Sequence, residues 1–236
     1  MKIEWNKVTA LSKAVALALF VALPFIGFWY GIQYGELAAY LRLENPSAAT
    51  TTTGYYGNVA EWQVNRDDAA GFSIAYPIDF DAQAGYAAKP SSDWRAGANG
   101  APGLTRFTLT IPRAFEPQSN FADAKLTVGD SGDARAVANC LAPDPTGGPA
   151  APTSSVSLNG TPFTEFHSAD VGAGNYYETT SYRTVHAGRC YAVEYTIHST
   201  QIMNYPASYH LRPFDKAKAA DLLDRIAGTF TFIAKP

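Results

Sequence analysis

Residues 176–199, YYETTSYRTVHAGRCYAVEYTIHS, alternate apolar or aromatic side chains with polar ones, as the two arms of a β-hairpin do. One face takes the even-numbered residues of the first arm and the odd-numbered residues of the second: Thr180, Tyr182 and Thr184, with Tyr191, Val193, Tyr195 and Ile197. Joining an even-numbered face to an odd-numbered one requires an even number of loop residues, which a two-residue turn at Ala187-Gly188 supplies. The sequence therefore predicts that Tyr182 lies opposite Val193.

The other face of this hairpin is polar. It carries Ser181, Arg183, Glu194 and Thr196. Antiparallel sheets commonly pack one face on the core and leave the other in water. We therefore expect this second face to be solvated.

The sequence on either side of the hairpin predicts further strands and one helix. Strands are expected at Gly71–Pro77 (GFSIAYP), Thr105–Pro112 (TRFTLTIP) and Thr229–Ile233 (TFTFI). A helical turn followed by a strand is expected at Asn120–Val128 (NFADAKLTV), and a loop is expected at Asp144–Ser155. Asp215–Gly228 is predicted to be an amphipathic helix with Asp215 as its N-cap. Its apolar residues at helical spacing are Ala219, Leu222, Leu223 and Ile226. Together these elements predict an α+β fold, an antiparallel sheet flanked by helices.

An uncharged stretch near the N-terminus predicts a transmembrane helix. Ala14 to Gly35 (AVALALFVALPFIGFWYGIQYG) has 22 residues, and a helix of that length, at about 1.5 Å per residue, spans a hydrocarbon core of about 30 Å. Lysines are in excess before this stretch, which predicts that residues 1–13 are cytoplasmic and that the rest lies outside. A cleaved signal peptide is the alternative, although the apolar run is long for one and no A-x-A-like site follows.

Residues 36–57 are expected to be a linker and residues 58–236 an extracytoplasmic domain. The linker includes NPSAATTTTGYYG at 45–57, which is low in hydrophobicity. From residue 45 onward, 14 Lys and Arg residues are outnumbered by 18 Asp and Glu residues. A chain without basic excess has little to neutralise phosphates with, so nucleic acid is not an expected partner.

The two cysteines, Cys140 and Cys190, are predicted to form a disulfide. Both follow the predicted transmembrane segment, and an exported domain lies in a compartment that permits disulfides. The bridge would close a loop of 51 residues that contains a Pro/Gly-rich stretch. A redox pair or a nucleophilic cysteine is the alternative, but no C-x-x-C spacing supports it.

Residues 129–133 (GDSGD) invite comparison with the G-D-S-G-G segment of chymotrypsin-like proteases. That mechanism needs a histidine base, which precedes the serine along the chain in that family. Here all four histidines follow Ser131: His167, His186, His198 and His210. We therefore interpret the segment as a turn.

No catalytic residue, metal site or cofactor is predicted. The histidines lack metal-ligand spacing, and His198, Glu194, Tyr177 and His186 are expected to form a polar surface cluster of the hairpin. Two aspartate pairs, Asp79 with Asp81 and Asp130 with Asp133, have too few ligands for a Ca²⁺ loop, and the second is expected to be a solvated turn. The sequon at Asn159-Gly160-Thr161 is followed by Pro162 and carries little weight.

Several segments resemble those of an uncharacterised group of single-pass envelope proteins, of the candidate-phyla type, that carry an exported PsbP-like domain. LPFIGFWYGIQYG at 23–35 is similar to their anchor, and GFSIAYP resembles the G-F-x-x-x-Y-P opening of the domain. NFADA at 120–124, Cys140-Leu141, Cys190-Tyr191 and IAGTFTF at 226–232 are similar to further parts of it. The resemblance implies an antiparallel sheet flanked by helices and assigns no catalytic residue.

The expected function is a non-catalytic binding or scaffold domain on the outer side of the cell membrane. Residues 14–35 would hold it in the lipid bilayer, and its sheet face or loops would engage another envelope protein or a cell-wall component. Two alternatives remain open: an envelope hydrolase without a recognisable motif, and a subunit of a cell-surface assembly. Converging carboxylates or histidines in a pocket would favour the hydrolase.

Overall fold

The computed structural model describes residues 12–24, 59–84, 94–98, 100–143 and 152–233. The chain divides into two compact units, Met1–Thr51 and Thr52–Pro236. In the first unit residues 12–24 are helical, with exposed side chains. Among the described residues no helix combines the length and the apolar character that crossing a bilayer requires. The predicted span at 14–35 continues beyond this helix, and residues 25–35 and the linker at 36–57 lie outside the described residues.

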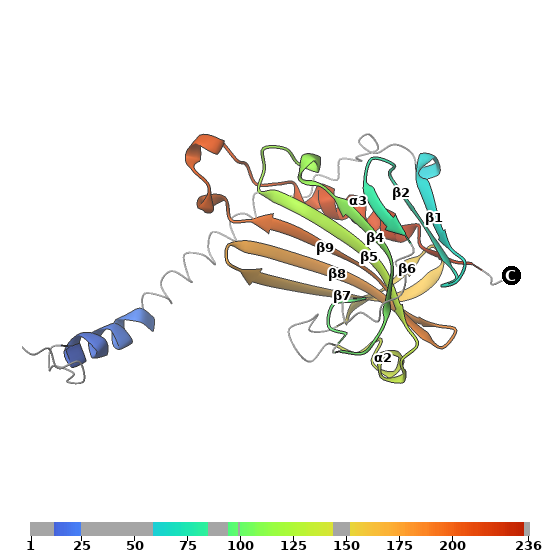
Figure 1. Ribbon diagram of the computed structural model, residues 1–236, viewed down its shortest axis with the longest axis horizontal. Coiled ribbons are helices and arrows are strands. Elements are labelled where there is room, and N and C mark those ends of the chain that lie inside the picture. The colour runs from blue at the N-terminus through green and yellow to red at the C-terminus, as the bar shows by residue number, and fades with distance from the viewer. Residues whose placement is uncertain (1–11, 25–58, 85–93, 99, 144–151, 234–236) are drawn as a thin grey trace, which may run out of the picture. The chain divides into compact units, whose positions relative to one another are not determined.

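Two antiparallel sheets make up most of the described part of the second unit (Figure 1). The larger sheet has the strand order β3 (Asp81–Ala84), β4 (Leu104–Ile111), β5 (Phe121–Ser131), β9 (Arg189–Thr200), β8 (Asn175–His186), β7 (Thr161–Gly172) and β6 (Pro152–Leu158). The smaller sheet has the order β1 (Gln63–Asp67), β2 (Phe72–Tyr76) and β10 (Thr231–Phe232). The helices are α2 (Ala134–Ala138) and α3 (Lys216–Gly228), with short 3₁₀ turns at Val59–Glu61, Arg113–Phe115, Ile202–Asn204 and Ala207–Tyr209. The predicted α+β class with an antiparallel sheet is confirmed.

The hairpin of β8 and β9 has the predicted register. Tyr182 pairs with Val193, and the two strands meet at the two-residue turn Ala187-Gly188. Both turn residues have positive φ, 48° and 73°, as a type I′ turn requires. The β6–β7 hairpin turns in the same way at Asn159-Gly160, which places the sequon in a tight turn.

One face of the large sheet packs against α3 and the small sheet. The four apolar residues predicted to face the core from α3 are all buried. Asp215 caps the helix as predicted, because its carboxylate accepts a hydrogen bond from the Lys218 N–H at 3.0 Å. The small sheet contributes Phe72, whose ring lies 5.4 Å from that of Phe230, centroid to centroid. This interface forms the main core, and in Figure 1 α3 lies behind the strands of the large sheet.

The predicted helical turn at the start of Asn120–Val128 is wrong, because β5 is a strand from Phe121 onward. The register shifts between Phe121 and Asp123, so one extra residue is accommodated in a bulge. The bulge brings Phe121 and Ala124 to the buried face although they are three positions apart, which is also the spacing of a helix.

The bounds of two other predicted segments, the final strand and the loop at 144–155, differ from those expected. The final strand β10 is shorter than the predicted Thr229–Ile233, because Thr229 instead caps α3 with its N–H bonded to Ile226. The predicted loop at 144–155 ends early, since residues 152–155 belong to β6. Residues 144–151 lie outside the described residues.

Candidate functional site

The second face of the large sheet is covered at one end by the segment of residues 94–98 and 100–103, which we call the covering segment. Trp94 is fully buried and lies between two glycines, one in the covering segment and one in β5. A Cβ atom at Gly103 would collide with the Trp94 ring, and one at Gly129 with its main chain. Only glycine permits so close an approach, so these two positions determine where the covering segment lies.

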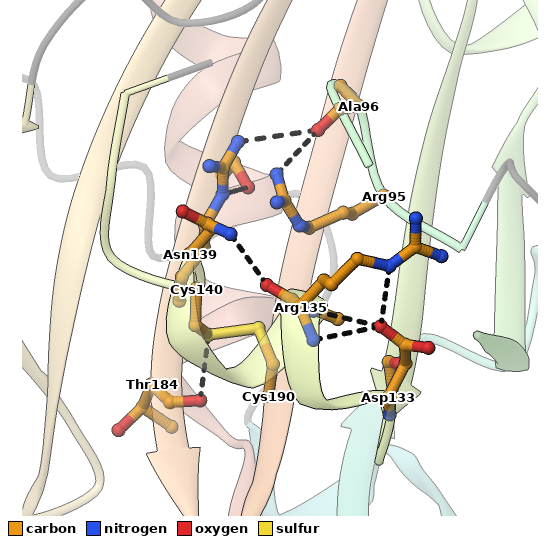
Figure 2. Close-up of a disulfide and its surroundings, with 12 residues drawn as sticks. Arg95, Ala96, Asp133, Arg135, Asn139, Cys140, Thr184 and Cys190 are labelled. Atoms are coloured by element: carbon orange, nitrogen blue, oxygen red, sulfur yellow. Dashed lines mark hydrogen bonds and ion pairs between the residues drawn. A yellow bond between two sulfur atoms is a disulfide. The ribbon is translucent and has the colours of Figure 1, made fainter. Parts of the chain in front are cut away.

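Cys140, just after α2, and Cys190, the second residue of β9, lie at disulfide distance with their sulfur atoms 2.06 Å apart (Figure 2). Both side chains are fully buried. Their apolar surroundings are Trp94, Ala98, Ala101, Ala136 and Ala192. The bridge therefore joins α2 to the sheet beside the covering segment, in an apolar cluster separate from the main core.

The covering segment buries much of the face that was expected to be solvated. Ser181 and Arg183 are completely buried, which corrects the expectation of an exposed polar face. The Arg183 guanidinium lies 4.3 Å from the ring centroid of Phe166, and its Nη2 donates to the Ala96 carbonyl at 3.4 Å. Arg95 donates to the same carbonyl at 2.9 Å, as Figure 2 shows.

Glu194 lies in the same covered region. One of its carboxylate oxygens accepts the Ala96 N–H at 2.8 Å. Burial raises the pKa of the Glu194 carboxyl above its ordinary value, against the opposing effects of this hydrogen bond, of the Ser181 hydroxyl and of Arg183. The arrangement attaches the covering segment to the sheet, so we assign Glu194 a structural role.

The GDSGD segment is not the solvated turn that was expected. Residues 129–131 are the end of β5, and Asp130 is fully buried, with Arg106 Nε 2.6 Å from one carboxylate oxygen and Arg189 bound to the other. Asp133 caps α2 by accepting the N–H groups of Arg135 and Ala136. The Ser131 hydroxyl donates to the Pro102 carbonyl and accepts from a main-chain N–H, so both of its partners are main-chain groups. Each polar side chain of the segment therefore stabilises the fold.

The expected histidine cluster is split between the two faces and the two ends of the hairpin. His198 stacks on Tyr177 with ring centroids 4.5 Å apart, on the second face. His186 stacks on Phe232 of the small sheet, with ring centroids 3.8 Å apart. His167 approaches the Thr180 hydroxyl at 3.0 Å, and His210 is exposed with φ of 47°. Within the described residues no three His, Cys, Asp or Glu side chains gather as a metal site would require.

Beyond the covering segment, the second face of the sheet carries two rows of polar side chains, which we call the open face. The strand registers align the first row across five strands: Thr110, Lys125, Thr196, Thr179 and Ser168. The second row crosses four strands: Asp123, His198, Tyr177 and Asp170. All of these residues are half-buried or exposed. Thr196, which sequence alternation placed on a solvated face, is half-buried. No local pattern shows that the rows line up across strands far apart in the chain.

A hydrogen-bonded group occupies the second row. His198 Nδ1 lies 3.0 Å from an Asp123 carboxylate oxygen, and His198 Nε2 lies 2.8 Å from the Asn175 side-chain oxygen. The Asn175 amide nitrogen donates to the carbonyls of Gly172 and Ala173, both at 3.3 Å, which is consistent with its oxygen pointing at the imidazole. Tyr177 is 36% exposed, so this stacked and hydrogen-bonded group reaches solvent.

A second polar network lies on the core face, where α3 crosses the hairpin. The hydroxyls of Tyr182 and Tyr195 both donate to the same oxygen of Asp224, at 2.8 and 2.7 Å. Burial and the Asp224 carboxylate raise the pKa of both phenols, so they remain neutral hydrogen-bond donors. The network attaches α3 to the sheet.

No protein-family model matches the sequence, and no curated protein is similar to it. The solved structures that are similar to this chain include the following two. One is a protein of Bacteroides thetaiotaomicron, 12% identical, with a TM-score of 0.39, in which 74% of this chain and 49% of that one are covered, so this chain spans about half its length. The other is the cyanobacterial PsbP protein (CyanoP) of Synechocystis, 13% identical, with a TM-score of 0.36, covering 80% of this chain and 99% of that one. TM-scores below 0.5 do not assign a function to this chain.

Proposed function

We propose that this chain is a non-catalytic binding domain that acts outside the cell membrane and is held there by residues 14–35. The open face is the observation that carries the proposal. It presents hydroxyl, carboxylate, imidazole, phenol and lysine side chains on consecutive strands of one sheet. Such a surface can form many weak directional contacts with a polar partner without a reactive group.

The roles of the buried ionisable groups support a binding domain over an enzyme. Buried Asp130 is neutralised by two arginines, and buried Glu116 by Arg212 and Lys218. Hydrogen bonds from Lys218 and Arg212 outweigh the effect of burial and lower the pKa of the Glu116 carboxyl. A carboxylate that is held in its charged form between two cations, as Glu116 is, is a poor proton donor or acceptor near neutral pH. The ion pairs of Asp130 and of Glu116 both join distant parts of the chain.

The location outside the membrane is supported by two features. The uncharged stretch at 14–35 follows a lysine-rich N-terminus. Cys140 and Cys190 lie at bonding distance, and disulfides persist in oxidising compartments outside the cytoplasm.

The experiment is site-specific photo-crosslinking in native membranes. A photoreactive residue at Lys125, which is exposed on the open face, is expected to give an adduct with the bound partner. The matched control places the same residue at Asp221, which is exposed on α3 and belongs to the opposite side of the sheet. Equal labelling at both positions, or none at Lys125, would contradict binding through the open face.

The anchor is tested separately. Deleting residues 14–35 is expected to release the protein from membranes washed with alkaline carbonate, whereas the full chain stays in the pellet.

Thiol-reactive reagents that cannot cross the membrane are expected to label Cys140 and Cys190 in intact cells only after reduction and unfolding. Labelling without reduction would contradict the disulfide, and no labelling after reduction and unfolding would contradict the extracytoplasmic location.

A further inference from the structure

We propose that the open face binds an uncharged polysaccharide chain that lies across the strands, along its two rows of side chains. This inference rests on the proposed function and names the chemistry of its partner. It is carried by three independent features of the face: the spacing of its hydroxyls, its immobilised aromatic ring and its charge.

The hydroxyls are arranged as an extended sugar chain would require. Thr196, Thr179 and Ser168 of the first row lie on three neighbouring strands, with Lys125 between Thr196 and Thr110. Neighbouring strands of a sheet are about 4.8 Å apart. This interval is close to the length of one pyranose unit in an extended polysaccharide. Each hydroxyl can donate and accept, as each sugar hydroxyl can, so successive units can repeat the same contacts along the row. Thr179 and Thr196 already bond to each other, with their oxygens 2.8 Å apart, so their positions are set before a ligand binds.

The aromatic ring of the second row is held in place. Tyr177 stacks on His198 with an angle of 16° between the ring planes, and His198 is held in turn by Asp123 and Asn175. An aromatic ring offers an apolar surface to the C–H groups of a sugar, while neighbouring carboxylate and amide groups bond to its hydroxyls. Because Tyr177 is already ordered, a ligand that stacks on it loses little additional side-chain entropy.

The charge of the face excludes anionic polymers. Its rows contain Asp123 and Asp170 but a single lysine, Lys125, and Asp81 continues the first row on β3. A surface with this balance repels phosphate-rich or uronate-rich chains. An uncharged chain of hydroxyls meets no such repulsion.

The test measures binding of the purified full chain, in detergent, to two insoluble polysaccharides, cellulose and chitin, which separate unsubstituted from N-acetylated sugars. Binding to either is expected. Replacing both Thr179→Val and Thr196→Val keeps the side-chain shape and is expected to weaken this binding by about tenfold, as the loss of two hydrogen bonds implies. Tyr177→Ala is expected to weaken it further.

The matched control is Thr184→Val, the same chemical change on the same strand but on the opposite face. Its affinity is expected to stay within about twofold of the parent protein. Circular dichroism confirms that each variant is folded. No binding to either polysaccharide, or equal binding by the double variant, would overturn this inference. A protein adduct in the crosslinking experiment would leave the binding function standing while excluding a polysaccharide partner, so the two failures are distinguishable.

Discussion

The main chain of Trp94 lies over Gly129 of β5, in the space that the Cβ atom of any other residue would occupy. Gly103 faces the indole ring in the same way, and the indole N–H donates to the Ala101 carbonyl at 3.1 Å. Trp94 therefore fixes the covering segment on the sheet, because Gly129 leaves room for its main chain and Gly103 leaves room for its ring.

Replacing Gly129→Ala is expected to displace the covering segment, because the new methyl group collides with backbone rather than with a flexible side chain. Overpacking of this kind destabilises by about 1–3 kcal/mol. The free energy of unfolding in urea measures the loss, and hydrogen exchange of residues 94–103 locates it. Gly172→Ala is the control, since nothing lies within 4 Å of a Cβ atom at that position. Equal losses in the two variants would show that the close approach is not what matters.

Removing the disulfide is expected to lower stability substantially. The cysteines are 50 positions apart, and the chain-entropy model gives about 4 kcal/mol for a loop of that size. Alanine at both Cys140 and Cys190 is expected to lower the urea midpoint as much as reduction of the parent protein does, while membrane insertion persists. Free thiols in the native parent protein would contradict the bridge.

Replacing Asp224→Ala is expected to destabilise the domain by about 1–3 kcal/mol, because two tyrosine hydroxyls under α3 lose their shared acceptor. Asp221→Ala removes an exposed carboxylate one turn earlier on the same helix and is expected to change stability by less than about 0.5 kcal/mol. Thermal unfolding of the two variants makes the comparison. A similar loss in both would indicate a general effect of charge on α3.

Glu116 is expected to make stability depend on acid pH. Its pKa is lowered in the folded protein by Lys218 and Arg212, despite burial, so the folded state binds this proton less readily than the unfolded chain does. The stability that the ionised Glu116 carboxylate contributes is therefore fully present above the pKa of the unfolded chain, about 4.3. This stability is lost as the pH falls through the lower pKa of the folded protein. Glu116→Gln is expected to lower stability at neutral pH by about 2 kcal/mol. It is also expected to make stability depend less steeply on pH in the acid range.

The control for that measurement is Glu61→Gln, which changes an exposed carboxylate. Denaturant midpoints recorded from pH 7 down to pH 3 compare the three proteins. If the stability of Glu116→Gln fell as steeply with pH as that of the parent protein, another carboxylate would be responsible for the loss of stability in acid.

The hairpin register and the amphipathic helix could be predicted because both follow from local periodicity. Alternation with period two and a two-residue turn leave a single register that pairs Tyr182 with Val193, and the N-cap and apolar stripe of α3 repeat with the turn of a helix. The start of β5 was mispredicted because a bulge gives Phe121 and Ala124 the spacing of a helix. Local pattern cannot distinguish the two, since only pairing with β9 creates the bulge.

Local residue patterns were enough to predict the α+β class and the central hairpin. The pairing of the cysteines could be predicted because the sequence contains only two. Which polar residues are buried depended instead on contacts between segments remote in sequence. Arg183 and Ser181 alternate as solvated residues do, yet they are buried beneath the covering segment, whose Ala96 carbonyl accepts a hydrogen bond from Arg183 across 87 positions of the sequence. The open face has the same origin: its rows exist because strands from five parts of the chain align, and a periodicity along one strand carries no information about the strands beside it.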